Sequence, residues 1–586
     1  MTIRTSLFGG AALGALLALA LTPAANAAAH HKKHHVAPPP VDDGLRSEVE
    51  TLKAQVDALQ AREDQEAAAR QQTQEQVQAL QGQLAQADAR AERAEQQVQA
   101  QIETIPGAVS EQVAAKLPKP GNVKVTLGGF SALETVYRSR NDVADIGSNY
   151  SKIPYLSSTS AHEDELRFTA RQSRISVLVQ GDVDPDTHAA FYGEFDFLGA
   201  GQTANSNESN SYQPRIRHMY GTVDWDALGF HVLAGQTWSL VTMNGKGISP
   251  RSEIIPPTIE AQYVAGFVWA RQPQLRFVKD FDDKQVWAAV SFENPQTTVA
   301  TSAEGGTSLL ATGVSANVNN AGISLLNNQV SYSENHYPDI VGKLAFEPLI
   351  GGAQPLHLEV FGLWRDYYDR VTYTSANTVG VAITGNCLSG GANATCKNID
   401  TSGGGVGGGV TWTVVPHLLD VQGSMLTGKG LGRYGSGQLP DTLESANGSL
   451  QPIGETMWLV GGTLHATPTL DLYAFYGDER QNSTGVEKIG SQVFGYGYAN
   501  AVLGAGCDIE GGSCATLDTQ QIDQITGGLW DKLYTGKFGS VRVGLQYSHT
   551  DLTAFPGYTA SNLLLATKPK TNDDMFFTSF RYYPGF

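Results

Sequence analysis

The sequence predicts a mainly β protein: a 16-stranded antiparallel transmembrane β-barrel preceded by an α-helical coiled coil. Three observations support this fold. Heptads of apolar residues cover residues 44–105, apolar and polar residues alternate along many segments after residue 122, and the connections between these segments alternate in length. The 586 residues include 64 Gly, which suits short strands joined by turns. The formal net charge of −18 argues against a nucleic-acid partner, because phosphate binding requires clustered Lys and Arg.

The first 27 residues have the features of a signal peptide. Arg4 supplies a positive charge, Phe8 to Leu21 is an apolar run, and Ala25-Asn26-Ala27 has the small residues found at a cleavage site. A membrane anchor is the alternative, which these small residues and the polar stretch from His30 to His35 argue against. We therefore expect cleavage after Ala27 and export to an oxidising compartment.

Residues 28–43 form a polar leader that contains HHKKHH and three consecutive prolines. Its four histidines could bind a divalent metal ion, and its basic cluster could contact an acidic polymer. A disordered spacer is the expectation, since Pro- and His-rich sequence has little apolar surface to bury.

Residues 44–105 carry the heptads of a coiled coil. With Leu45 at a d position the register holds without a slip, and thirteen of the eighteen a and d residues are apolar. A weaker zone is expected from Glu63 to Thr73, where polar residues occupy these positions. The rod would be about 90 Å long at 1.5 Å per residue. A single solvated helix or a disordered segment is the alternative, and Val at a with Leu at d favours two strands. Residues 106–121 form a linker to the next domain.

From residue 122 to 586 the apolar pattern has a period of two. It is clearest in THAAFYGEFDFLG, where Phe191 and Phe195 share one face while Tyr192, Glu194 and Asp196 share the other. A soluble sandwich would turn its apolar face to a core, whereas a membrane barrel turns it to lipid and keeps the polar face around the lumen. Local alternation fits both folds, so the layout of the whole domain must decide.

Sixteen strands account for this domain. The predicted spans are 123–138, 165–181, 188–198, 214–226, 229–238, 265–278, 284–293, 338–347, 356–368, 404–416, 418–428, 456–467, 469–480, 525–536, 540–551 and 573–586. Their connections alternate between short and long, the long ones including residues 139–164, 294–337, 369–403, 429–455 and 481–524. Outer-membrane barrels combine an even strand number with tight periplasmic turns and long outer loops. A sandwich would not be expected to alternate its loop lengths in this way.

The four cysteines fall in two Gly- and Ser-rich loops. Cys387 and Cys396 are nine residues apart, and Cys507 and Cys514 are seven apart. In an oxidising periplasm each pair would close a local disulfide. A metal site is the alternative, but zinc sites favour closer cysteines and nearby histidines. Both pairs lie in long connections, which supports the assignment of those loops to one end of the barrel.

The last predicted strand is rich in aromatic residues and ends at Phe586. Counting back from it, alternate residues are Pro584, Tyr582, Phe580, Thr578 and Phe576. A terminal strand of this kind resembles the signal read by the barrel-assembly machinery of the outer membrane. The strands must also close on themselves, since an open edge would leave unpaired backbone groups in hydrocarbon.

Several segments of the barrel domain resemble the DcaP-like porins. These are LRFTARQSRISVLVQGD (residues 166–182), FYGEFDFLG, PRIRHMYGTVDW and VLAGQTWS. The resemblance implies a homotrimer with a periplasmic coiled coil, sixteen-stranded barrels in the outer membrane of a Gram-negative bacterium, and passage of small anionic solutes such as dicarboxylates. It is strongest between residues 123 and 280 and covers most of the mature chain. The other partners expected are outer-membrane lipid, the barrel-assembly machinery and peptidoglycan.

The third long connection, residues 239–264, would fold inward and narrow the channel as in general porins. Charged residues on this loop and on the neighbouring strands are the candidates for the pore constriction: Arg174, Glu194, Asp196, Arg215, Arg217, Lys246, Arg251, Glu253 and Arg271. Charges around a narrow aqueous passage orient polar solutes and bias ion selectivity. The alternative is that the arginines pair with Glu194 and Asp196 to hold the wall together, and both roles can coexist. Anion preference is the expectation.

Three other functions are alternatives to a porin. An enzyme is not expected, because neither a G-x-S-x-G nor an H-E-x-x-H motif is present, and no cofactor or metal site is predicted. An envelope tether, in which the rod links the membrane to the periplasm or peptidoglycan, is the main alternative. An energy-coupled receptor would need about 22 strands and an N-terminal plug.

Overall fold

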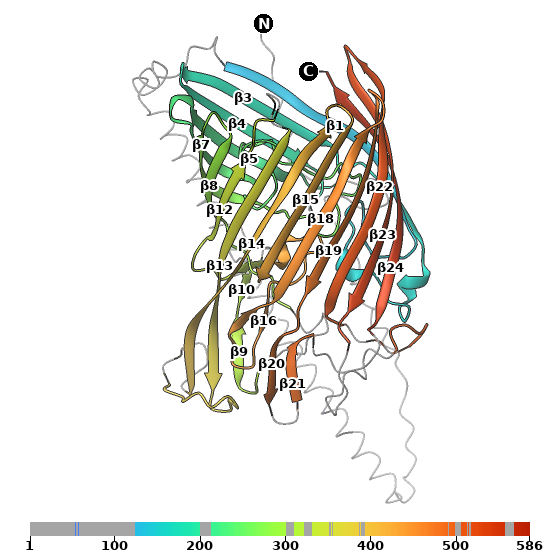
Figure 1. Cartoon of the computed structure of the whole chain (residues 1–586). Coiled ribbons are helices and arrows are strands. Elements are labelled where there is room, and N and C mark those ends of the chain that lie inside the picture. The colour runs from blue at the N-terminus through green and yellow to red at the C-terminus, as the bar shows by residue number, and fades with distance from the viewer. Residues whose placement is uncertain are drawn as a thin grey trace, which may run out of the picture. The chain divides into compact units, whose positions relative to one another are not determined.

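Sixteen strands form a closed antiparallel barrel in the computed structural model (Figure 1). They are β1 (Val123–Arg138), β3 (Arg174–Asp184), β4 (Thr187–Asp196), β5 (Arg215–Trp225), β6 (Phe230–Trp238), β7 (Arg271–Phe281), β8 (Val286–Glu293), β12 (Asp339–Phe346), β13 (Leu356–Thr374), β14 (Ala394–Val415), β15 (Leu419–Lys429), β18 (Gly454–His465), β19 (Leu470–Gln481), β22 (Thr519–Gly536), β23 (Gly539–Ala554) and β24 (Lys570–Pro584). The structure describes residues 53, 57, 123–199, 212–300, 310–321, 331–350, 353, 355–385, 387, 393–489, 492–497, 506–512, 514, 517–556 and 568–585.

The first strand closes the barrel. One edge of β1 pairs with β24, from Ser131 opposite Tyr582 to Arg138 opposite Met575. Its other edge pairs first with β3 and then with the short β2 (Glu165–Thr169). The predicted second strand is therefore confirmed in two pieces, with residues 170–173 between them. Closure leaves no unpaired sheet edge to face lipid.

The predicted number of barrel strands is confirmed, but several of the predicted boundaries are wrong. Strand β7 begins at Arg271 and not at residue 265, because the apolar residues 265–270 belong to a buried loop. Strands β13 and β14 pair as far as Thr374 opposite Ala394, well into the predicted loop 369–403. The polar and Gly-rich composition of that hairpin concealed its regular backbone pairing.

Connections of two kinds lie at opposite ends of the barrel. Short turns such as residues 185–186, 282–285, 416–418 and 537–538 join strands at the end where β1 starts and β24 finishes. The strands joined by the long connections meet them at the other end, drawn lowest in Figure 1. Both predicted disulfides are confirmed on that side: Cys387 is bonded to Cys396, and Cys507 to Cys514.

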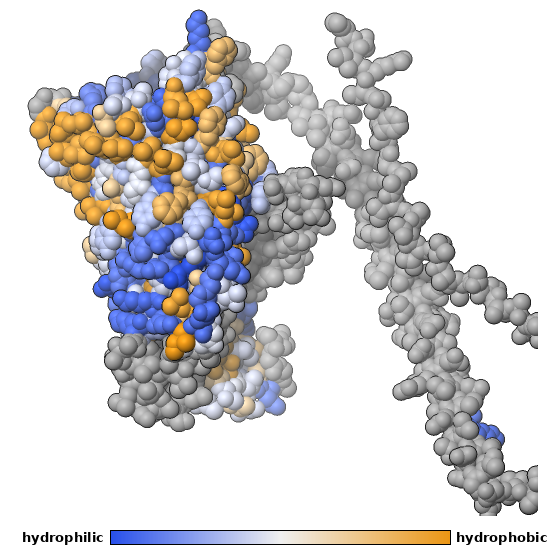
Figure 2. Space-filling view, turned by 90° about the vertical axis from the view of Figure 1, so that its right-hand side faces the viewer, coloured by the Kyte–Doolittle hydropathy of each residue, from blue (hydrophilic) through white to orange (hydrophobic). Residues whose placement is uncertain are grey.

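The outer face of the barrel is apolar near the short-turn end. On β1 and β24 the exposed positions include Leu127, Leu133, Phe576 and Phe580, and the residues between them, such as Glu134, are buried inside. Figure 2 shows an apolar band in the upper part of the barrel and a hydrophilic zone nearer the long loops. A closed barrel with an apolar outer band has the surface expected of a protein embedded in a lipid bilayer.

Exposed tryptophans mark the two limits of this band on neighbouring strands. Trp412 on β14 lies opposite Leu356, and Trp364 on β13 lies opposite Gly404. The stretch from Leu356 to Trp364 corresponds to about 26 Å of strand, close to the apolar band of outer-membrane barrels once tilt is allowed for. Aromatic rings at both limits are typical of the membrane–water interfaces.

Several predictions concern residues outside the described part of the chain. They are the signal peptide 1–27, the leader 28–43, most of the coiled coil 44–105, the linker 106–121 and the terminal Phe586. Among the residues that the structure describes, none forms a helix with the length and hydropathy needed to cross a membrane.

Candidate functional site

Loop 3 (residues 239–270) crosses the interior of the barrel between β6 and β7. Side chains on the inner wall accept hydrogen bonds from its backbone N–H groups at both ends of its path. The pairs are Leu240 to Glu293 at 2.8 Å, Asn244 to Glu359 at 3.0 Å, Gly247 to Glu347 at 2.6 Å, Ile259 to Gln546 at 2.6 Å, Ala265 to Gln524 at 3.0 Å, and Gly266 to Glu479 at 2.8 Å. Buried N–H groups without partners are costly, so these six acceptors fix the loop inside the barrel.

Gly266 allows loop 3 to lie directly on the wall. Its φ is +82°, and a Cβ added to it would lie 2.0 Å from the carbonyl oxygen of Trp458 on β18. Only glycine fits so close to a neighbouring backbone in this conformation. The inward course predicted for this loop is therefore observed, although the loop runs six residues further than predicted.

Loop 6 (residues 430–453) also enters the barrel, which the sequence did not predict. The N–H of Trp269 in loop 3 donates to the carbonyl of Tyr434 at 2.8 Å, and Gln262 donates to the carbonyl of Ser436 at 2.7 Å. Arg365 on β13 anchors the loop through Asp441 at 2.7 Å. The buried apolar residues of loop 6, such as Leu431, were the available signal, but its Gly-rich sequence resembles that of an exposed loop.

A cavity of about 450 Å³ remains in the lumen beside residues 254–261 of loop 3. Four arginines on neighbouring strands of the closure region line it, and we call them the basic arc: Arg174 on β3, Arg217 on β5, Arg542 on β23 and Arg581 on β24. Another part of the lining, on β15, β18 and β19, carries Asp420, His465 and Asp471. His465 contacts Asp420 at 3.0 Å and Asp471 at 2.7 Å, so the basic arc faces a mixed His–Asp group across the cavity.

Two members of the basic arc are neutralised by carboxylates. Arg217 pairs with Glu194 at 2.6 Å and with Asp196 at 2.9 Å. Arg581 pairs with Glu134 at 2.6 Å. Their charge is largely balanced by these carboxylates in the wall. For Arg217 this agrees with the alternative role of holding the wall together.

The other two members carry charge that is less compensated. Arg174 reaches Glu194 only at 4.0 Å, and its buried Nε has no hydrogen-bond partner. Arg542 lies against the ring of Tyr583, and within the described residues no carboxylate comes within ion-pairing distance of it. A cation near the lumen without a fixed partner is available to a passing anion.

The structure brings five of the predicted constriction residues together at the loop end of β3, β4 and β5. Arg215 joins Arg217 on Asp196, with the Arg215 Nη2 at 2.7 Å from the carboxylate, and Glu194 and Arg174 lie beside them. Arg271 lies close to this group but stacks on Trp238 and Trp269 and is not part of the cavity lining.

The three predicted residues of loop 3 lie away from this cavity. Lys246 is exposed, and Arg251 donates a hydrogen bond to the hydroxyl of Tyr220 at 3.0 Å. The Oε1 of Glu253 is buried and accepts no hydrogen bond. The loop lines the cavity instead with a largely apolar stretch that includes Pro256 and Pro257.

Sequence reasoning missed Arg542 and Arg581 in the basic arc. Arg581 directly follows the exposed Phe580, so the period of two alone places it inside the barrel. Arg542 lies directly opposite Arg581 in the β23–β24 ladder and therefore shares its face. The alternation along the strand therefore indicated that Arg581 faces the lumen, but the prediction from sequence used only the aromatic residues of this strand.

Glu260 ties loop 3 to the loop that follows β1. Its carboxylate accepts hydrogen bonds from the Ser148 N–H at 2.9 Å, the Ser148 hydroxyl at 2.7 Å and the Gln262 N–H at 3.0 Å. Burial raises the pKa of Glu260 to about 7, against the opposing attraction of Arg138. This anchor therefore changes charge near neutral pH.

Comparison with known proteins supports the fold. No protein-family model and no curated sequence matches the chain significantly. The crystal structure of the outer membrane channel DcaP of Acinetobacter baumannii matches with a TM-score of 0.51 and 17% identity, covering 80% of this chain and 99% of that one. An anion-selective porin from Comamonas acidovorans matches at a TM-score of 0.39 and 12% identity, with 79% and 99% of the two chains covered. The likeness to DcaP shows that this chain shares the barrel fold of an outer-membrane channel.

Proposed function

We propose that this protein is an outer-membrane porin through which small polar solutes diffuse passively. The observation that carries the proposal is a closed barrel with an apolar outer band and, inside it, a polar cavity beside a loop fixed across the lumen. A barrel of sixteen strands is wide enough to hold an aqueous channel. The fold shared with DcaP supports an outer-membrane location.

Anionic, dicarboxylate-like solutes are the proposed cargo. Arg174 and Arg542 face the cavity with little compensating charge, while Arg217 and Arg581 are paired. Asp420 and Asp471, which share the His465 ring, lie on the other side and would help to orient a dipolar solute. The remaining predicted constriction residues, Arg215, Lys246, Arg251, Glu253 and Arg271, would act on the approach to this cavity.

The active form is proposed to be a homotrimer held by the coiled coil of residues 44–105. The heptads supply a helical association surface, and the exposed aromatic face of β24, with Phe576 and Phe580, supports recognition by the assembly machinery. Deleting residues 44–105 should lower the oligomeric state and leave a conducting barrel. An envelope defect with unchanged conductance would support the tether instead.

Solute uptake by proteoliposomes tests the proposal. Vesicles containing the protein should swell in isotonic small dicarboxylates and admit a neutral solute of equal size more slowly, because the basic arc favours anions. Heat-denatured protein serves as the control for leakage. Vesicles that stay impermeable to every small solute would exclude a porin.

A further inference from the structure

A cluster of one histidine and two aspartates lies on the outer surface, just beyond the aromatic limit of the apolar band. Asp366 follows Trp364 by two residues on the same face of β13, and Tyr337, next to His336, packs against Trp364 with ring centroids 6.2 Å apart. Asp400 projects from β14, where it lies opposite Tyr368. The cluster therefore occupies the interface on the side of the long loops.

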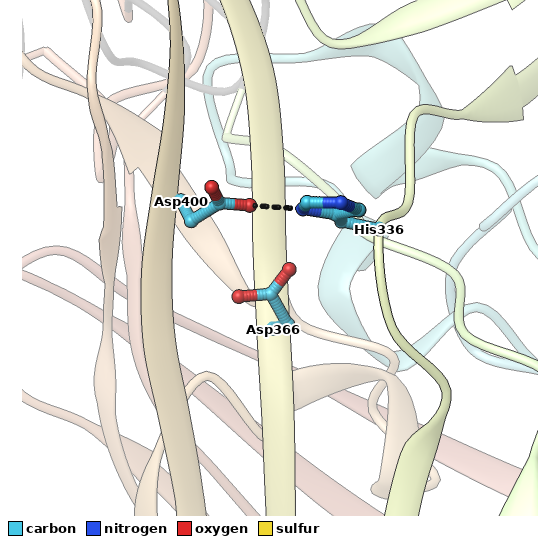
Figure 3. Close-up of side chains that lie close together, drawn as sticks. All are labelled: His336, Asp366 and Asp400. Atoms are coloured by element: carbon cyan, nitrogen blue, oxygen red, sulfur yellow. Dashed lines mark hydrogen bonds and ion pairs between the residues drawn. The ribbon is translucent and has the colours of Figure 1, made fainter.

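The three side chains converge on one point, as Figure 3 shows. One ligand atom of each residue lies within 4.8 Å of those of the other two, and the Nδ1 of His336 is 3.0 Å from the Oδ1 of Asp400. The His336 ring is held in place between aromatic neighbours, with centroids 4.4 Å from Tyr337 and 5.2 Å from Tyr368. Such support keeps a ligand in position before the ion arrives.

One carboxylate oxygen of Asp366 receives no hydrogen bond in this cluster. Its side chain is only 4% exposed, its Oδ2 accepts no hydrogen bond, and it points toward His336 and Asp400 (Figure 3). A buried carboxylate without a donor or a cation is costly. Another partner is therefore needed at this point.

A second histidine with two aspartates shows what a complete arrangement looks like. His231 places Nδ1 2.8 Å from Asp224 and Nε2 2.9 Å from Asp280, so both ring nitrogens have carboxylate partners. At His336 a single nitrogen contacts a carboxylate and Asp366 is left over. The two clusters share composition, but the His336 ring contacts one carboxylate where the His231 ring contacts two.

We propose that His336, Asp366 and Asp400 bind a divalent transition-metal ion, zinc being the ion that their chemistry suits best. Imidazole nitrogens and carboxylate oxygens are both zinc ligands, and three protein ligands leave a fourth position for a water molecule. Calcium and magnesium prefer oxygen ligands alone. In a tetrahedral site the ligand atoms are about 3.3 Å apart, so modest side-chain rotation would close the present spacing. The bound ion would fasten the segment before β12 to the β13–β14 hairpin.

No local sequence motif indicates this site, because its ligands come from three segments that are 30 and 34 residues apart. Strand pairing brings them together: β13 and β14 align Asp366 with Ser402, two residues from Asp400. The expectation of no metal site came from searching for local motifs. The proposal does not depend on the proposed transport function.

Zinc titration of the mature protein in detergent, after EDTA treatment, tests the site. The His-rich leader can also bind zinc, so the comparison is made on protein that lacks residues 28–43. This protein should bind one equivalent of zinc, and Asp366→Asn should weaken that binding at least tenfold. Asp551→Asn is the matched control and should bind zinc like the parent: Asp551 lies 3.5 Å from Nε2 of His549, whose Nδ1 lies 2.8 Å from Asp574.

His336→Gln and Asp400→Asn guard against a folding defect at the buried Asp366, since both side chains are about half exposed. Each should remove the visible absorption of cobalt(II) bound at the site while leaving the heat-induced mobility shift of the barrel unchanged. Equal zinc binding by the parent and all three cluster variants would overturn the proposal. Calcium binding without zinc binding would also overturn it.

Discussion

The barrel wall and loop 3 satisfy their buried backbone groups by different means. In the wall, each strand pairs with the backbone of its neighbours, and side chains decide only which face meets lipid. In loop 3, single side chains such as Glu359, Glu479 and Gln546 accept the hydrogen bonds of the backbone. The wall should therefore tolerate most lumen substitutions, whereas loop 3 depends on individual residues.

Substitution of Gly266 should have the largest effect on the stability of loop 3. Gly266→Ala forces a Cβ to within 2.0 Å of the Trp458 carbonyl oxygen at a φ of +82°. We expect a loss of about 3 kcal/mol in the free energy of unfolding and altered single-channel conductance. Gly245→Ala is the control in the same loop, because its nearest neighbour is 3.6 Å away. Equal thermal midpoints for the two variants would show that the close contact is not needed.

Removal of the Glu479 carboxylate should have the next largest effect. Glu479 accepts hydrogen bonds from Gly266 in loop 3 and Gly437 in loop 6, so Glu479→Ala leaves two buried N–H groups without partners. The expected cost is about 2 to 4 kcal/mol. Chemical denaturation should show a smaller loss for Glu479→Gln and almost none for Arg480→Ala, whose side chain is on the outer face. If Glu479→Ala does not change the free energy of unfolding, the loops are held by packing alone.

The Glu260 anchor should make the stability of loop 3 depend on pH. The native carboxyl has a pKa of about 7 against an ordinary value of 4.5, so the folded state binds more protons between these two values. Stability should therefore be greatest below about pH 4.5 and fall as the pH rises toward 7. Glu260→Gln should reduce this dependence, measured as the difference in thermal midpoint between pH 5 and pH 8, because the variant removes one of the titrating groups. Identical pH profiles for the two proteins would contradict this assignment.

The smallest effect is expected at the wall itself. Thr526 faces the interior and hydrogen bonds to Ser548 at 2.9 Å, and Ser548 also accepts a hydrogen bond from the Gln546 amide at 3.0 Å. Thr526→Ala leaves Ser548 with this second partner and should change the free energy of unfolding by less than about 1 kcal/mol. A loss as large as that of Glu479→Ala would remove the distinction between wall and loop.

The two regions also differed in how well the sequence predicted them. The wall follows a period of two, which is why every predicted barrel strand was found and why Phe191 and Glu194 took opposite faces. Loops 3 and 6 have no such period: residues 265–270 were assigned to a strand because they are apolar, although they are buried by the opposite wall. Long-range contacts decide their course, so the six wall acceptors became visible only in the structure.

The reversal potential of the channel in a planar lipid bilayer tests the central claim most directly. Under a potassium chloride gradient the native protein should conduct with anion preference, and Arg174→Ala combined with Arg542→Ala should reduce the chloride-to-potassium permeability ratio severalfold. Arg480→Ala, on the outer face, should leave it unchanged. Cation preference in the native protein, or no conductance at all, would contradict the account.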